Sequence, residues 1–232
     1  MQGIADFIEL EQIYSQTLGN GIHSLAVCAA NSGEGCTSLA CALAERHQKS
    51  GYSCLLVDMN LYRPAFDRYF NLPRADWSLE EHSSSSAMVN LAQGYNVLTA
   101  STLPAMDFRK SELVNRFIET WRRSFDAIVI DTSPLNALNR NNIPAELICG
   151  AADAALLVVR SNKTTESELL TAYNRLQRCS ARLAGVVMND AECPTLAEEL
   201  LRETTRLERM LPRIASWFAN KIRSSHFLNL SV

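Results

Sequence analysis

Long uncharged apolar runs are absent from this sequence. The longest, such as residues 154–159, fall far short of the roughly 20 residues that a membrane-spanning helix needs. Residues 1–6 contain no basic segment leading into an apolar one, so no secretion signal is recognisable there. We therefore expect a protein that is made and kept in the cytoplasm.

Paired CxxC spacing is also absent, and the number of cysteines, seven, is odd. Both features argue against a disulfide framework or a zinc cluster, and they favour reduced thiols that serve mostly as small core residues. An excess of charge is missing as well, because the formal net charge is only -3. Such a chain has no overall field that attracts nucleic acid, so no nucleic-acid partner is expected.

The rest of the composition is that of a folded protein. Of the 232 residues, 47% are apolar and 20% are charged, which is close to the globular average and argues against disorder. We expect an amphipathic helix within residues 1–20, one domain over residues 21–193 and a helical extension over residues 194–232.

Apolar runs alternate with helical patterns along the chain. Strands are predicted at residues 22–30, 54–57, 96–99, 127–130, 154–159 and 183–188. Helices are predicted at residues 4–18, 37–50, 111–124 and 166–179, with a short helix after Pro64 and a loop or frayed helix at 80–86. Because the strands are apolar throughout and alternate with helices, we predict an α/β fold whose mostly parallel sheet has helices on both faces. Ligands bind such sheets beyond the carboxyl ends of the strands.

A glycine-rich loop follows the first predicted strand. Its residues are Gly33, Glu34, Gly35, Cys36, Thr37 and Ser38. They match a phosphate-binding loop at its last glycine and its hydroxyl residue, but not at its first glycine or its lysine. The glycines let backbone N–H groups turn inward and the next helix adds its positive end, so an anion can be bound without a side-chain cation. Taken alone, the loop is equally compatible with an ordinary strand-to-helix turn.

Two later strands end in a carboxylate, Asp58 and Asp131. Together with the glycine-rich loop, residues 58–64 (DMNLYRP) and 125–134 (FDAIVIDTSP) resemble three motifs of the bacterial tyrosine kinases of the Wzc, CpsD and CapB type. In that family the motifs read like PGEGKST, DADLRRP and IDTPP. Further resemblances lie at residues 111–113, 155–160 and 185–189. The likeness runs from about residue 9 to residue 189.

The resemblance implies a P-loop NTPase-like fold of the MinD, ParA and Mrp superfamily, which binds ATP or ADP with Mg²⁺. By this resemblance, Asp131 would hold the Mg²⁺ through water, Thr37 would ligate it directly, and Asp58 would help to activate the attacking hydroxyl. Residues 33–38 would bind the nucleotide. Asn189 would lie near the adenine, although a role in capping its own strand is also open.

Departures from the family motifs oppose catalysis. Cys36 replaces the lysine that neutralises the phosphates, Asn60 replaces the second carboxylate of the second motif, and Asn31 supplies no second lysine. The alternative sources of a cation are Arg63, Lys163 and a neighbouring subunit. A thiol at a helix N-terminus usually has a lowered pKa, so Cys36 is either a redox sensor or nucleophile, or simply a small residue tolerated once catalysis was lost.

The parts that these kinases use for autophosphorylation and assembly are incomplete. The kinases phosphorylate a C-terminal cluster of tyrosines, whereas the last tyrosine here is Tyr173. Their oligomer motif, roughly ExxRxxR, corresponds at best to Glu11, Tyr14 and Thr17, with both arginines absent. Autophosphorylation of the usual kind is not expected, and a homo-oligomer stays open.

The likeness fades beyond residue 189. Residues 195–209 have the pattern of a charged helix, and residues 212–223 that of a short basic amphipathic helix with Trp217 and Phe218 among its apolar residues. The second helix would either rest on the inner membrane surface or a membrane partner, or pack on the domain.

Three functions follow as hypotheses. The leading one is a non-catalytic relative of the tyrosine kinases that regulates exopolysaccharide or capsule assembly by binding a partner, such as a membrane polysaccharide co-polymerase. The second is an atypical but active ATPase or tyrosine kinase. The third is a MinD-like or ParA-like positioning factor at the membrane, for which lipid binding through Trp217 and Phe218 would be diagnostic.

Overall fold

The computed structural model describes residues 8–79, 83–91, 94–137 and 139–190. The chain divides into two compact units, Met1–Asn189 and Asp190–Val232. The helices predicted at 195–209 and 212–223 lie outside the described residues, so they stay predictions, as do the domain boundaries. No helix among the described residues is long and apolar enough to cross a membrane.

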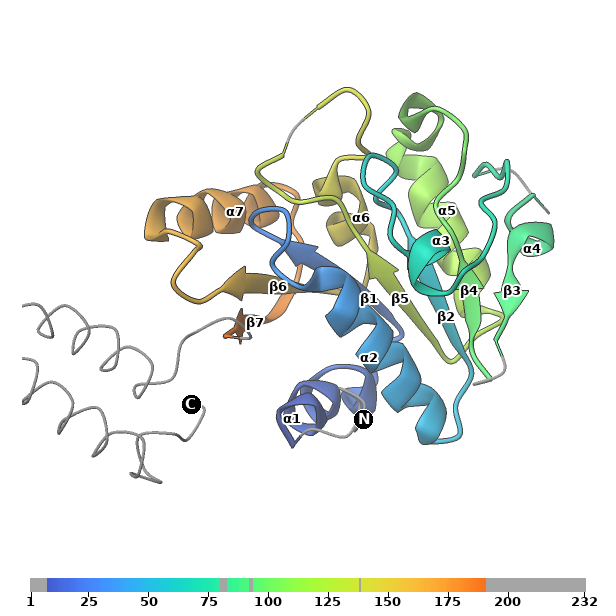
Figure 1. The fold of residues 1–232 in the computed structure, drawn as a ribbon, viewed down its shortest axis with the longest axis horizontal. Coiled ribbons are helices and arrows are strands. Elements are labelled where there is room, and N and C mark those ends of the chain that lie inside the picture. The colour runs from blue at the N-terminus through green and yellow to red at the C-terminus, as the bar shows by residue number, and fades with distance from the viewer. Residues whose placement is uncertain (1–7, 80–82, 92–93, 138, 191–232) are drawn as a thin grey trace, which may run out of the picture. The chain divides into compact units, whose positions relative to one another are not determined.

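In the described part of the chain, seven strands form one sheet in the order β3-β4-β2-β5-β1-β6-β7 (Figure 1). The strands are β1 (Ser24–Ala29), β2 (Cys54–Asp58), β3 (Val89–Asn90), β4 (Asn96–Leu98), β5 (Ala127–Asp131), β6 (Ala154–Arg160) and β7 (Leu183–Asn189). All neighbouring pairs are parallel except β3 and β4. The prediction of an α/β fold with a mostly parallel sheet is therefore confirmed.

Helices cover both faces of this sheet (Figure 1). They are α1 (Ile8–Gln16), α2 (Cys36–Lys49), α3 (Phe66–Tyr69), α4 (Ser83–Ala87), α5 (Ser111–Arg122), α6 (Ala145–Ala151) and α7 (Glu166–Arg178), with 3-10 turns η2 (Leu18–Asn20) and η3 (Ala105–Phe108). The helices α1, α2 and α3 contribute to one hydrophobic cluster, and α5, α6 and α7 contribute to the other.

The central strand β1 shows how the sequence produces these two layers. Leu25 and Val27 belong to the cluster that contains α1 and α2, whereas Ala26 and Cys28 belong to the cluster that contains α5 and α6. Side chains alternate across a strand, so a strand covered on both faces must be apolar at every position. All six residues of β1 are indeed buried.

The helices were predicted from their spacing, and the longer ones are where we expected them. In α5, four buried residues recur at intervals of three and four: Val114, Phe117, Ile118 and Trp121. Helix α7 begins at a capping box, in which the Thr165 hydroxyl accepts from the Glu168 N–H and the Glu168 carboxylate accepts from the Thr165 N–H. Helix α6 and strand β3 were not predicted. They have seven and two residues, too few for a periodic pattern to be recognised.

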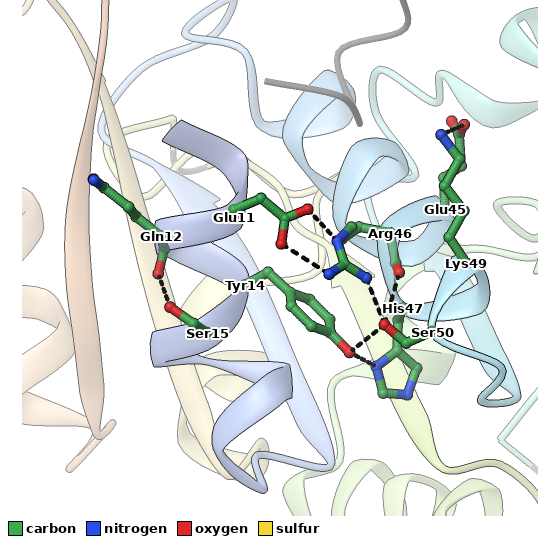
Figure 2. Close-up of polar contacts among 9 residues, drawn as sticks. All are labelled: Glu11, Gln12, Tyr14, Ser15, Glu45, Arg46, His47, Lys49 and Ser50. Carbon is green, nitrogen blue, oxygen red and sulfur yellow. Dashed lines mark hydrogen bonds and ion pairs between the residues drawn. The ribbon is translucent and has the colours of Figure 1, made fainter. Parts of the chain in front are cut away.

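Helix α1 is held on α2 by polar side chains as well as by its buried Leu10 (Figure 2). The Arg46 guanidinium donates to both oxygens of Glu11 and lies 4.5 Å from the centre of the Tyr14 ring. The Tyr14 hydroxyl is 3.2 Å from Nδ1 of His47 and from Oγ of Ser50. Two of the three residues that correspond to the family's oligomer motif, Glu11 and Tyr14, thus contact α2 of the same chain, whereas Thr17 bonds to carbonyls at the end of α1.

Candidate functional site

The carboxyl ends of three adjacent strands, β2, β5 and β1, form the candidate site. Asp58 lies opposite Asp131 in the register of β2 and β5, and Val27 of β1 lies opposite Asp131 on the other side. A cavity of about 340 Å³ opens beyond these ends. It is lined by residues 31–38 of the glycine-rich loop together with Ala29, Asn60, Arg63, Asp131, Thr132 and Pro134. The structure therefore brings together every predicted loop residue and Asp131.

The loop is shaped by two glycines and braced by one buried carboxylate. Gly33 and Gly35 have φ values of 82° and 103°, which residues with a side chain rarely adopt. Glu34 is only 1% exposed, and its carboxylate accepts hydrogen bonds from the backbone N–H of Asn31 at 3.0 Å and from the hydroxyl of Thr164 at 2.6 Å. The Glu34 side chain therefore supports the loop from within the protein.

Asn189 contacts the outside of the same loop. Its Nδ2 donates to the carbonyl oxygen of Glu34 at 2.9 Å, and a Cβ atom on Gly35 would lie only 2.4 Å from this nitrogen. Asn189 is not among the residues that line the cavity. It ends β7 and joins the strand to the loop, while its predicted place near an adenine stays a prediction.

Thr37 and Asp131 meet at the floor of the cavity. The Thr37 hydroxyl donates to Oδ2 of Asp131 at 2.7 Å, whereas Oδ1 of Asp131 is buried and bonds to no described residue. Burial, with a smaller contribution from Asp58, raises the pKa of Asp131 to about 8. A hydroxyl beside a carboxylate oxygen that lacks a partner suits Mg²⁺, which prefers oxygen ligands. These two residues would hold the metal, and the metal would neutralise phosphate charge.

Asp58, which was predicted to help activate an attacking hydroxyl, accepts hydrogen bonds from backbone N–H groups. It is fully buried, and its two oxygens accept from the backbone N–H groups of Asn60, Ala65 and Phe66 at 2.9, 2.8 and 3.2 Å. Burial nevertheless raises its pKa to about 6. Asp58 thus fixes the turn after β2 and is not among the residues that line the cavity. Its catalytic role stays a prediction.

Cys36 begins α2 at the position of the missing lysine. Its side chain is buried, and burial raises the pKa of the thiol, with further contributions from the charges of Asp131 and Glu34. A raised pKa disfavours the thiolate that a redox sensor or nucleophile needs, and the interpretation of Cys36 as a reactive thiol stays a prediction. Desolvation and two nearby carboxylates raise the pKa by more than the positive end of α2 lowers it.

Among the residues that line the cavity, Arg63 is the single cation. Its Nη1 donates to the hydroxyl of Ser32 in the loop at 3.0 Å. Lys163 does not line the cavity, but Arg160 donates from Nη1 to the carbonyl of Gly33 at 3.3 Å. Sequence reasoning did not single out Arg160, although it ends the strand next to β1, a position from which a side chain can reach the loop.

Comparison with solved structures identifies the class of fold. The chain superimposes with a TM-score of 0.69 and 23% identity on the chimerical protein CapA2B2, covering 81% of this chain and 86% of that one. It also matches the septum site-determining protein MinD of Pyrococcus horikoshii, which was solved with Mg-ADP, with a TM-score of 0.60 and 14% identity over 74% and 72% of the two chains. The fold is that of the MinD-type P-loop proteins.

Sequence comparison then identifies particular relatives. No family model matches the chain. The chain is 26% identical over 182 residues to the tyrosine-protein kinase CpsD of Streptococcus pneumoniae, covering 75% of this chain and 78% of the kinase. It is also 26% identical over 173 residues to the tyrosine-protein kinase YwqD of Bacillus subtilis, covering 72% and 71%. The chain is therefore similar in sequence to bacterial tyrosine-protein kinases over about three quarters of its length.

Proposed function

We propose that this protein is a non-catalytic homologue of the bacterial tyrosine kinases that regulates exopolysaccharide or capsule assembly by binding a protein partner. The observation that carries the proposal is the environment of Cys36. At the position where a phosphate-binding loop has its lysine, this chain has a buried thiol whose pKa is raised. Phosphoryl transfer depends mainly on electrostatic stabilisation of the phosphates. Loss of the lysine therefore removes about 3–4 kcal/mol of transition-state stabilisation.

Two further features support the absence of catalysis. Asn60 lines the cavity where the relatives' motif has a second carboxylate, so an expected charge is missing from the site. Residues 174–232 contain no tyrosine, so this part of the chain carries no acceptor cluster of the usual kind. Both departures favour a role that depends on a protein partner.

The resemblance to kinases of polysaccharide export suggests the partner. We propose that the partner is a cytosolic segment of a membrane polysaccharide co-polymerase. This partner would place the protein in the cytoplasm, next to the inner membrane. Nucleotide binding with Mg²⁺ would persist weakly, because the loop backbone, Thr37 and Asp131 retain the geometry for an anion and a metal.

Calorimetric titration with Mg-ATP and Mg-ADP tests the proposal. We expect the wild type to bind nucleotide no more tightly than the millimolar range, and Cys36→Lys to bind more tightly, because the lysine returns the missing charge to the loop. Cys36→Met is the matched control, since it adds a long side chain without charge and should bind no more tightly than the wild type. Micromolar binding of ATP by the wild type would contradict the proposal.

A second candidate, an active but atypical ATPase or tyrosine kinase, is favoured by the position of Arg63. This guanidinium lines the cavity and bonds to Ser32 of the loop, so it is the available substitute for the lysine. If this candidate is correct, Arg63→Gln abolishes nucleotide hydrolysis, whereas Lys163→Gln, which removes a cation outside the cavity, leaves it unchanged. Absence of hydrolysis in the wild type under the same conditions eliminates this candidate.

A further inference from the structure

The segment between β5 and α6 closes around a second, very small cavity. Its lining residues come from both ends of that segment, including Ser133 just after β5 and Asn142 and Glu146 around the start of α6. The space open to the centre of a water molecule is about 10 Å³. This volume is about the minimum, roughly 10–15 Å³, that one water molecule requires.

Three polar atoms of the lining residues are buried without a partner among the described residues. They are Oγ of Ser133, Oδ1 of Asn142 and Oε2 of Glu146. Ser133 and Asn142 are only 2% and 3% exposed, so bulk water does not reach these atoms. Buried polar atoms nearly always have a hydrogen-bond partner, because leaving them without one is destabilising.

The remaining polar atoms of these side chains are already bonded. Nδ2 of Asn142 donates to the carbonyl of Ala137 at 2.8 Å, which fixes the orientation of the amide and leaves Oδ1 as an acceptor. Oε1 of Glu146 accepts from Arg175 at 2.9 Å, which leaves Oε2 as an acceptor. The Ser133 hydroxyl can donate. The cavity therefore presents two acceptors and one donor.

We propose that this cavity is a binding site for one water molecule, which links Ser133, Asn142 and Glu146. The water donates its two hydrogens to Oδ1 of Asn142 and Oε2 of Glu146, and it accepts the hydrogen of the Ser133 hydroxyl. Three hydrogen bonds are the usual number for a buried water. A cation is disfavoured because the charge of Glu146 is already compensated by Arg175.

The water connects the far side of the candidate site to helix α6. Ser133 lies between Thr132 and Pro134, both of which line the cavity of the glycine-rich loop. From the other side, Arg109 donates to the carbonyl of Asn142 at 2.7 Å. Backbone hydrogen bonds from Thr132 to Val27 and from Leu135 to Ala29 attach the start of this segment to β1, and the water adds a link from the segment to α6.

Ser133→Ala tests the proposal, because it removes only the hydroxyl that bonds to the water. With the water in place, the variant loses a hydrogen bond and its Tm falls by a few degrees relative to the wild type. Without it, the variant removes an unpartnered buried hydroxyl and its Tm is unchanged or raised, which overturns the proposal. Ser124→Ala is the control, since Ser124 is exposed and its Tm should not change.

A crystal structure of the full chain gives the direct observation. We expect density for one water within roughly 2.7–3.2 Å of all three oxygens. Absence of this density overturns the proposal. A cation in the site would overturn the proposal as well. It would be shown by a Tm that rises when KCl replaces NaCl at constant ionic strength in the wild type but not in Glu146→Gln.

Discussion

The Thr37 hydroxyl donates to Oδ2 of Asp131 at 2.7 Å, and this single contact joins the start of α2 to the end of β5. It shows why the candidate site keeps its geometry although the lysine of the loop is missing. The side chains of Thr37 and Asp131 position each other, and their hydrogen bond does not involve Cys36. The contact therefore holds the candidate site together without a cation at residue 36.

The buried carboxylate of Asp131 should reduce the stability of the protein. Its Oδ1 has no partner among the described residues, and its raised pKa reflects the unfavourable burial of a charge. We expect Asp131→Asn to raise the free energy of unfolding by about 1–3 kcal/mol, as removal of an uncompensated buried group does. Chemical denaturation without Mg²⁺ measures this difference.

Asp126, at the opposite end of β5, provides the control for that experiment. Its carboxylate accepts from the hydroxyl and the backbone N–H of Ser53, which hold its pKa below the usual range. Asp126→Asn should therefore lower stability, the opposite sign to Asp131→Asn. If both substitutions destabilise the protein equally, the interpretation of Asp131 as a destabilising buried charge is wrong.

Gly35 is required for two reasons, its backbone conformation and its contact with Asn189. At φ 103° a side chain is strained, and a Cβ would lie 2.4 Å from Nδ2 of Asn189. Gly33 has φ 82° but no atom within 4 Å of its Cβ position. We expect Gly33→Ala to lower the free energy of unfolding by about 1–2 kcal/mol from strain alone, and Gly35→Ala to lower it further.

A double variant separates the two effects at Gly35, which are backbone strain and the contact with Asn189. Combining Gly35→Ala with Asn189→Ala removes the atom that the new Cβ meets, so the combined loss should be smaller than the sum of the two single losses. Strictly additive losses would show that the loop relaxes away from Asn189 and that the contact does not constrain it.

His47 should make stability depend on pH. Its ring is buried between Tyr14 and Tyr52, 5.2 Å from the Tyr52 ring centre, and burial lowers its pKa below the usual value of about 6.5. A histidine with a lowered folded-state pKa takes up protons more readily when unfolded, so its contribution is present above pH 6.5 and is lost as pH falls. Between pH 7 and pH 5, the wild type should therefore lose stability relative to His47→Gln, so the two curves of Tm against pH should have different slopes. Identical slopes would contradict this.

Arg46 should control how firmly α1 stays on α2. Arg46→Met keeps the length of the side chain but removes the bonds to Glu11 and the cation above Tyr14 (Figure 2). We expect faster amide exchange and faster proteolysis within Ile8–Gln16 while the rest of the fold is unchanged. Arg175→Met, which removes the hydrogen bond from α7 to Glu146 of α6, is the control and should leave α1 protected.

The order of the elements, and the edge of the sheet at which a ligand would bind, could be predicted from local patterns in the sequence. Strands buried on both faces and helices with an apolar stripe are local patterns, so β1, β2, β5, β6 and β7 and the long helices α2, α5 and α7 could be predicted within a few residues of their observed ends. The carboxylate that ends β5 and the glycine-rich loop were also predicted to share one site. Helix α6 was missed because its seven residues carry too little periodicity.

The tertiary structure decided the chemistry within that site. Only the folded structure shows that Arg63 lines the cavity while Lys163 does not. It also shows that the Asp58 carboxylate accepts hydrogen bonds from three backbone N–H groups. The raised pKa of the Cys36 thiol likewise comes from burial and from Asp131 and Glu34. Burial, electrostatic fields and hydrogen-bond partners depend on which segments the fold brings within a few ångströms of one another, and the spacing of residues along a chain does not contain that information.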